Sequence, residues 1–288
     1  MNAILEPVTG RYVRFEHDDR PYRIYFEEAG QGIPLLCLHT AGSDSRQFRG
    51  LLNEPRITER FRVIAFDLPW HGKSSPPPGW QRGAYRLTST SYSDLILAFM
   101  AALGLERPVV MGCSIGGRIC LHLALAHAAK FRAIVGLQSA ASTPRYYDPT
   151  WLSHPEVNGP VAGAATVMGL MCPESPEAER WETLWHYMQG GPGVFGGDLY
   201  FYQVDGDFRT RVQDIDTEVA PLYLLTGAYD YSCSPQDTRE TAAHIAGARV
   251  RIMPKLGHFP MSEHPQAFIA ELLPVLEEIA DEQRSTAG

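Results

Sequence analysis

The feature that most constrains the fold is a regular alternation of apolar runs with segments of helical periodicity. The apolar runs, which predict strands buried on both faces, are residues 33–40, 62–67, 108–113, 133–138, 221–227 and 248–253. The periodic segments lie at residues 95–103, 115–129, 235–246 and 265–280. Residues 11–17 and 22–30 alternate and are split by Asp18-Asp19-Arg20-Pro21, which predicts an antiparallel hairpin. This order predicts an α/β fold with a mostly parallel eight-stranded sheet and helices on both of its faces.

The alternation is interrupted once, between residues 141 and 219. This stretch has no buried-strand pattern and is rich in aromatic residues and methionine. An insertion of that length cannot be a structureless loop inside a compact domain. We therefore expect a mainly helical cap over residues 141–219, inserted between two parts of a core at residues 1–140 and 220–288.

Composition excludes several classes of protein. With 44% hydrophobic residues and 20% charged residues, the 288-residue chain can bury a sizeable core. A formal net charge of −8 and the lack of a basic cluster argue against a nucleic-acid partner. No apolar run reaches the roughly 18 residues of a membrane helix, and the N-terminus lacks the pattern of a secretory signal. The five cysteines form no Cys-x-x-Cys pair, so we expect a reduced, cytoplasmic protein whose oligomeric state stays open.

The segment with the clearest chemistry is Gly112-Cys113-Ser114-Ile115-Gly116-Gly117, between an apolar run and a periodic segment. A serine on a sharp strand-to-helix turn projects its hydroxyl above the sheet, and the helix N-terminus behind it favours an anion. The flanking glycines are required because a side chain would collide with a neighbouring strand or helix. A phosphate-binding or simply tight glycine turn is the alternative, but the strand before and the helix after it favour a nucleophilic serine.

A serine hydroxyl needs a base, and the base needs an orienting group. Asp230 follows the run at 221–227, and His258 follows the run at 248–253. Taken alone, Asp230 is an ordinary loop acid or helix cap, and His258 an ordinary surface or core histidine. Their joint placement after successive strands, where parallel sheets carry reactive groups, favours a Ser-Asp-His triad.

These motifs resemble those of the α/β-hydrolase family, in its capped serine hydrolase form, over essentially the whole chain. The resemblance rests on residues 38–42 (Leu-His-Thr-Ala-Gly), 67–74 (Asp-Leu-Pro-Trp-His-Gly-Lys-Ser), 112–117, 227–230 and 257–260. It implies that Ser114 is the nucleophile, His258 the base and Asp230 its orienting carboxylate. It also implies an oxyanion hole made by the backbone N–H groups of Ala41 and Ile115.

Two positions depart from the family pattern. Thr40 stands where the family commonly has glycine, and a β-branched residue restricts the loop, which leaves Thr40 or Gly42 as alternative oxyanion donors. Trp70 stands at a usually small position, where it either plugs the loop or lines the substrate pocket.

Most aromatic and methionine side chains of the cap must form its own core, and the remainder should line an apolar pocket above Ser114. The candidate substrate-binding residues are Thr40, Trp70, Trp151, Trp185, Met188 and Tyr202. Arg145 or Arg209 are candidates to meet a substrate carboxylate, with an exposed ion pair as the alternative. No metal or other cofactor is expected, since His122 and His127 point to different helix faces and no HExxH motif is present.

The sequence thus predicts a cofactor-independent serine hydrolase that cleaves a small to medium, apolar carboxylic ester or lactone through an acyl-enzyme. A C–C bond hydrolase of ring-cleavage dicarbonyl products is the nearest alternative, and thioester or perhydrolase chemistry stays open. A ligand receptor without catalytic activity, built on the same fold, is the alternative from another class.

Overall fold

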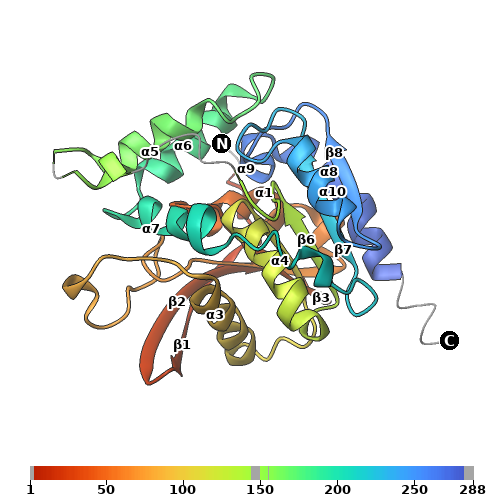
Figure 1. Cartoon of the computed structure of the whole chain (residues 1–288), viewed down its shortest axis with the longest axis horizontal. Coiled ribbons are helices and arrows are strands. Elements are labelled where there is room, and N and C mark those ends of the chain that lie inside the picture. The colour runs from red at the N-terminus through yellow and green to blue at the C-terminus, as the bar shows by residue number, and fades with distance from the viewer. Residues whose placement is uncertain (1–2, 144–149, 155, 282–288) are drawn as a thin grey trace.

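The computed structural model describes residues 3–143, 150–154 and 156–281, and these are organised around one eight-stranded sheet (Figure 1). The strands are β1 (Thr9–His17), β2 (Arg20–Ala29), β3 (Ile33–Leu38), β4 (Phe61–Phe66), β5 (Val109–Cys113), β6 (Ala133–Leu137), β7 (Leu222–Gly227) and β8 (Arg249–Met253). Their order in space is β1-β2-β4-β3-β5-β6-β7-β8. Pairing is antiparallel for β1 with β2 and β2 with β4, and parallel for every later pair. The mostly parallel eight-stranded sheet is confirmed.

The first two strands form the expected hairpin. His17 pairs with Arg20, so Asp18 and Asp19 make a two-residue loop. Both have positive φ, at 50° and 56°, as a loop that follows the right-handed twist of the strands requires.

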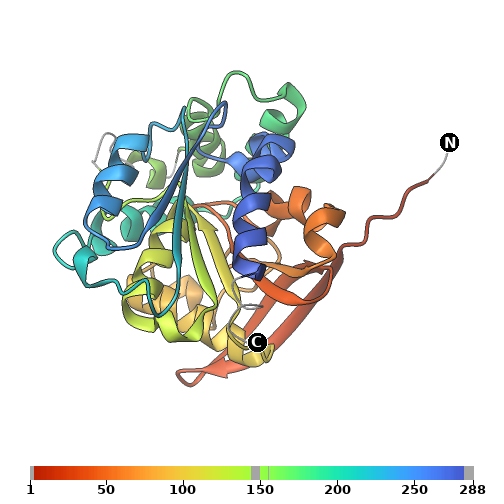
Figure 2. The ribbon, with the colours of Figure 1, turned by 90° about the vertical axis from the view of Figure 1, so that its right-hand side faces the viewer.

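The central strands are apolar throughout because both of their faces are covered. Along β3, Leu35 and Cys37 belong to one core cluster, and Leu36 and Leu38 belong to the other, as the alternation of a strand dictates. The cluster with Leu36 includes residues of α3 (Ser89–Ala102) and α4 (Ile115–His127). The cluster with Leu35 includes residues of α1 (Arg49–Leu52) and α10 (Pro265–Asp281). Figure 2 shows α10 and α4 on opposite sides of the sheet.

Between Thr150 and Asp214, the described residues contain helices and no strand. The elements are η4 (Thr150–Ser153), α5 (Gly159–Met168), α6 (Glu177–Met188), α7 (Val194–Tyr200), the π-helical turn η5 (Phe201–Asp205) and η6 (Val212–Asp214). Figure 1 shows α5 and α6 together above the carboxyl ends of the strands. This helical content supports our proposal that residues 141–219 are a cap between core parts 1–140 and 220–288.

The remaining elements are short, with one exception. They are η1 (Ser45–Phe48), α2 (Pro55–Thr58), η2 (Trp80–Arg82), η3 (Ala128–Lys130), α8 (Pro235–Ala243) and α9 (Pro260–Glu263). The nine-residue helix α8 begins at a capping box formed by Ser234 and Asp237. Among the described residues, no helix combines the length and apolarity needed to cross a membrane.

All five cysteines are free thiols, and all are buried. Three of them lie in the sheet or in α4, namely Cys37, Cys113 and Cys120. Burial raises the pKa of the Cys113 and Cys120 thiols, which keeps these side chains neutral within the core.

Candidate active site

Ser114 occupies the turn between β5 and α4. Its φ is 59°, which is uncommon for a residue with a side chain, and its own N–H donates to the Leu137 carbonyl at 3.0 Å. A Cβ on Gly112 would lie 2.2 Å from the Gly116 carbonyl oxygen, and one on Gly116 would lie 2.5 Å from the Leu38 carbonyl oxygen. A side chain at either position would therefore collide with neighbouring backbone, as expected, and glycine at both positions lets α4 approach the sheet closely.

Asp230 and His258 come together at the same edge of the sheet. Asp230 follows β7 and His258 follows β8, and the distance from His258 Nδ1 to Asp230 Oδ2 is 2.8 Å. The other carboxylate oxygen, Oδ1, accepts the N–H groups of Ser232 at 2.7 Å and Cys233 at 3.1 Å. Since an ionised carboxylate only accepts, Nδ1 of His258 is the donor, which leaves Nε2 of the neutral ring as an acceptor.

The histidine loop also contacts the serine turn. The thiol of Cys113, the residue before Ser114, donates to the His258 carbonyl oxygen at a sulfur–oxygen distance of 3.2 Å. Ser114, Asp230 and His258 are all buried. Three segments far apart in the sequence therefore meet at the carboxyl ends of β5, β7 and β8.

The backbone around Ala41 distinguishes the three candidate oxyanion donors. The Thr40 N–H donates to Gln47 Oε1 at 3.1 Å, and the Gly42 N–H donates to Asp198 Oδ2 at 2.8 Å. The Ala41 N–H has no intramolecular acceptor within the described part of the chain. Ile115 is the first residue of α4, where an N–H has no intrahelical acceptor. Of residues 40–42, only Ala41 thus leaves its amide available.

Two buried polar side chains hold the acid and histidine loops, and sequence reasoning missed both. Gln138 donates through Nε2 to the Gly257 carbonyl at 2.7 Å and accepts the Gly227 N–H through Oε1 at 2.9 Å. Its place directly after a buried strand was a signal that could have found it. Glu263 accepts the N–H groups of Gly257 and Phe259. Burial raises its pKa, although these backbone donors favour the charged form.

A small pocket lies between the loop at Gly42 and the helices α5, α6 and α7. Its lining is Gly42, Leu152, Gly159, Pro160, Gly163, Tyr187, Gly190, Gly191, Gly193, Phe195 and Gly196. None of these side chains carries a charge. The predicted contact residue Thr40 is buried beside this lining, with its hydroxyl 2.5 Å from the Tyr187 hydroxyl.

The other predicted contact residues lie outside this lining. Trp151 and Trp185 are 48% and 57% exposed, because they lie on outward faces of their helices. Met188 packs against the core cluster between α5 and α6, and Tyr202 is buried against the guanidinium of Arg118.

The remaining candidate residues for substrate binding are Trp70, Arg145 and Arg209. Trp70 has φ of 78°, and its ring packs on those of Trp80 and Tyr85 at centroid distances of 5.5 and 5.2 Å. Arg209 forms an exposed ion pair with Asp207 at 2.8 Å, as the alternative interpretation expected. Arg145 lies outside the described residues.

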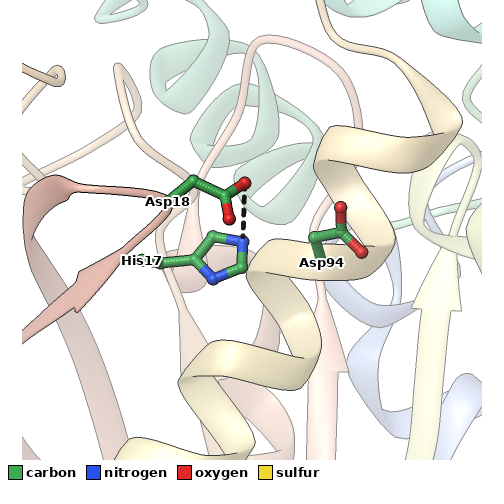
Figure 3. Close-up of side chains that lie close together, drawn as sticks. All are labelled: His17, Asp18 and Asp94. Atoms are coloured by element: carbon green, nitrogen blue, oxygen red, sulfur yellow. Dashed lines mark ion pairs between the residues drawn. The ribbon is translucent and has the colours of Figure 1, made fainter.

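His17, Asp18 and Asp94 bring three potential metal-ligand atoms within 4.8 Å of one another (Figure 3). They lie at the β1–β2 turn and on α3, and none belongs to the loops that carry Ser114 or His258. The contact within the group is an ion pair of 3.6 Å between His17 Nε2 and Asp18 Oδ2. Acidic groups often lie together at a protein surface without a bound ion, so this cluster alone does not indicate a metal site.

Comparison with known proteins identifies the class. Residues 35–271 match the Alpha/beta hydrolase family, and the chain belongs to this family. It is 22% identical to the 2-hydroxy-6-oxononadienedioate/2-hydroxy-6-oxononatrienedioate hydrolase of Cupriavidus pinatubonensis, over 93% of this chain and 95% of that one. Among solved structures it resembles an esterase from Thermogutta terrifontis, with a TM-score of 0.81, 18% identity and coverage of 94% and 99%. It also resembles the enol-lactonase from Burkholderia xenovorans LB400, with a TM-score of 0.77, 19% identity and coverage of 89% and 97%.

Proposed function

We propose that the protein is a cofactor-independent serine hydrolase that cleaves a small to medium, mainly apolar carboxylic ester or lactone. The observation that carries this proposal is the 2.8 Å hydrogen bond between His258 and Asp230, at the edge of the sheet where Ser114 occupies the N-cap position of α4. The order Ser, Asp, His along the chain is that of the family's hydrolases.

The mechanism follows from the roles of these groups. Nε2 of His258 takes the Ser114 proton as the hydroxyl attacks the acyl carbonyl, and the N–H groups of Ala41 and Ile115 receive the oxyanion. Removing one such donor typically costs about 3 kcal/mol of transition-state stabilisation. His258 then protonates the leaving group and activates the water that hydrolyses the acyl-enzyme. Asp230 holds the imidazole in one tautomer and stabilises its charged form.

The lining of the pocket supports an apolar substrate. It combines glycine backbone with the aromatic rings of Tyr187 and Phe195, and it lies against Gly42, next to the proposed oxyanion donor. A charged group placed there would lose its hydration without gaining an ion pair, which is costly.

A fluorophosphonate probe tests the nucleophile. We expect it to add once to the wild-type protein and not to Ser114→Ala, and both proteins should fold alike. Ser139→Ala is the matched control, because Ser139 is another buried serine that follows a parallel strand, here β6. Labelling of Ser114→Ala at the wild-type rate would exclude Ser114 as the nucleophile.

The C–C bond hydrolase stays a second candidate because the Cupriavidus relative is named a hydrolase of 2-hydroxy-6-oxononadienedioate and matches 93% of this chain. Aryl esters, lactones and a ring-cleavage dicarbonyl acid assayed side by side separate the two. Turnover of the dicarbonyl acid alone would favour C–C cleavage. Binding of a ligand with at most a single turnover would favour a receptor.

A further inference from the structure

Asp198 is a fully buried carboxylate that lies outside the proposed triad. It belongs to α7, in the proposed cap, yet its hydrogen-bond partners come from the core. Oδ2 accepts the Gly42 N–H at 2.8 Å and lies 2.8 Å from His71 Nε2, and Oδ1 accepts the Tyr85 hydroxyl at 2.7 Å. A buried carboxylate with three donors is strongly held in place.

The hydrogen bonds define the charge of His71. Its Nδ1 lies 3.0 Å from the Pro69 carbonyl, which only accepts, so Nδ1 carries a proton. Its Nε2 faces the Asp198 carboxylate, which also accepts, so Nε2 carries a proton too. Burial disfavours this imidazolium, but the charge of Asp198 and its hydrogen bond outweigh burial and raise the pKa of His71. His71 and Asp198 therefore form a buried ion pair.

The neighbouring His39 is neutral, unlike His71. Its Nδ1 donates to the Thr40 carbonyl at 2.8 Å, and its Nε2 accepts the Leu68 N–H at 3.1 Å, so the ring is neutral. Burial and the nearby charge of His71 lower the pKa of His39 to about 4. The two rings are tilted by 45° with centroids 4.8 Å apart, and of the two only His71 pairs with Asp198.

The ion pair is connected directly to the loop that carries the proposed oxyanion donor. Ala41 lies between two residues whose N–H groups are both engaged, Thr40 by Gln47 and Gly42 by Asp198. The bond to Asp198 fixes the 41–42 peptide plane. The 40–41 plane, which carries the Ala41 N–H, is held at the Thr40 carbonyl by His39 Nδ1 at 2.8 Å and by the Ser43 N–H at 3.3 Å. Gly42 has φ of 66°, and a Cβ there would lie 2.9 Å from the ring of Phe195, three residues before Asp198 on α7.

We propose that Asp198 is a positioning residue, which orients the Ala41 N–H toward the oxyanion by accepting the Gly42 N–H. This inference rests on the proposed serine hydrolase function. If Asp198 has this role, the oxyanion hole is complete only when α7 is docked on the core, because the accepting carboxylate of Asp198 belongs to the proposed cap and the Gly42 N–H belongs to the core. Cap docking and assembly of the reaction centre are then one event.

Asp198→Ala tests this role, with Asp205→Ala as the matched control. Asp205 also belongs to the helical stretch after Gly193 and also accepts a core N–H, that of Ser89, but it does not contact residues 40–42. We expect Asp198→Ala to lower kcat for an aryl ester about 100-fold, because a displacement of the Ala41 N–H by about 1 Å reduces the rate by roughly that factor. KM should stay within about threefold of the wild-type value. Asp198→Asn keeps an oxygen that can accept the Gly42 N–H, so its kcat should be at least about tenfold higher than that of Asp198→Ala. Asp205→Ala should retain the wild-type kcat.

Hydrogen exchange and a second variant test the same role independently of Asp198→Ala activity. Hydrogen exchange at Gly42 should be faster in Asp198→Ala than in Asp205→Ala, a readout that needs no activity. If Asp198→Ala fails to fold, the double variant His71→Phe/Asp198→Leu replaces the ion pair with apolar side chains, an exchange that often preserves stability. It should show the same loss of kcat and the same faster exchange.

The outcomes separate this inference from the proposed function. Wild-type kcat and unchanged Gly42 exchange in the Asp198 variants would overturn the positioning role, while Ser114-dependent hydrolysis would still stand. An equal loss in Asp205→Ala would also overturn it, because it would indicate a general role in cap attachment. Absence of Ser114-dependent hydrolysis in the wild-type protein would overturn both.

Discussion

Replacing Gly116 with alanine should separate α4 from β3 and displace the serine turn. The added Cβ would lie 2.5 Å from the Leu38 carbonyl oxygen and 2.9 Å from Leu38 Cβ. Ordinary van der Waals contact begins at 3.4 Å, so the helix must retreat by roughly 0.9 Å. Leu38 cannot yield instead, because β3 is paired on one side with β4 and on the other with β5.

The expected cost has two parts. Overpacking of this kind destabilises by about 1–3 kcal/mol, which lowers the melting temperature by several degrees in a domain of this size. Displacement of the Ser114 hydroxyl by nearly 1 Å should lower kcat by about 100-fold. KM should change little, because the pocket residues on α5 to α7 do not move.

Urea unfolding followed by circular dichroism measures the first effect, and aryl-ester kinetics measure the second. Gly169→Ala is the control, since Gly169 ends α5 at φ of −72° with no atom within 4 Å of the added Cβ. It should be neutral or stabilise by up to about 1 kcal/mol. A Gly116→Ala protein with the wild-type unfolding midpoint and the wild-type kcat would refute the steric argument for this glycine.

Two other predictions concern the buried polar groups. Gln138→Leu leaves the Gly227 N–H and the Gly257 carbonyl without partners, so it should cost about 2–4 kcal/mol of stability; an unchanged urea midpoint would contradict this. Burial lowers the pKa of His186 to about 4 in the folded protein. As the pH falls below about 6.5, His186 is therefore protonated in the unfolded chain but not in the folded one. Between pH 7.5 and 5.5 the free energy of unfolding of the wild-type protein should therefore fall by about 1.4 kcal/mol more than that of His186→Gln. Urea unfolding at both pH values measures this difference. Equal losses in the two proteins would show that the pKa of His186 is not lowered by folding.

The sheet and the family could be predicted from sequence because their signals are local. Apolar runs, the glycines around Ser114 and the polar residues directly after strands each lie within a few neighbouring positions. The hydrogen bonds of Asp198 and Gln138 could not be predicted in this way. Each depends on partners about 90 to 160 residues away, and no pattern in the sequence says which side chains meet across the sheet edge.

The lining of the pocket near Gly42 was hard to predict for a different reason. Aromatic residues in the segment 141–219 indicate apolar surface, but not which face of each helix is covered. On α6, Trp181 and Trp185 share the exposed face, while Leu184 and Tyr187 pack inward. The lining near Gly42 consists largely of glycine, which carries no hydrophobic signal at all.

The buried thiols have a practical consequence. Because all five cysteines are enclosed, with Cys113 directly before Ser114, an alkylating reagent has no sulfur to reach while the chain remains folded. The rate of sulfhydryl modification would therefore measure opening of the fold around each cysteine, and loss of activity on such treatment would report unfolding and not chemistry at the serine.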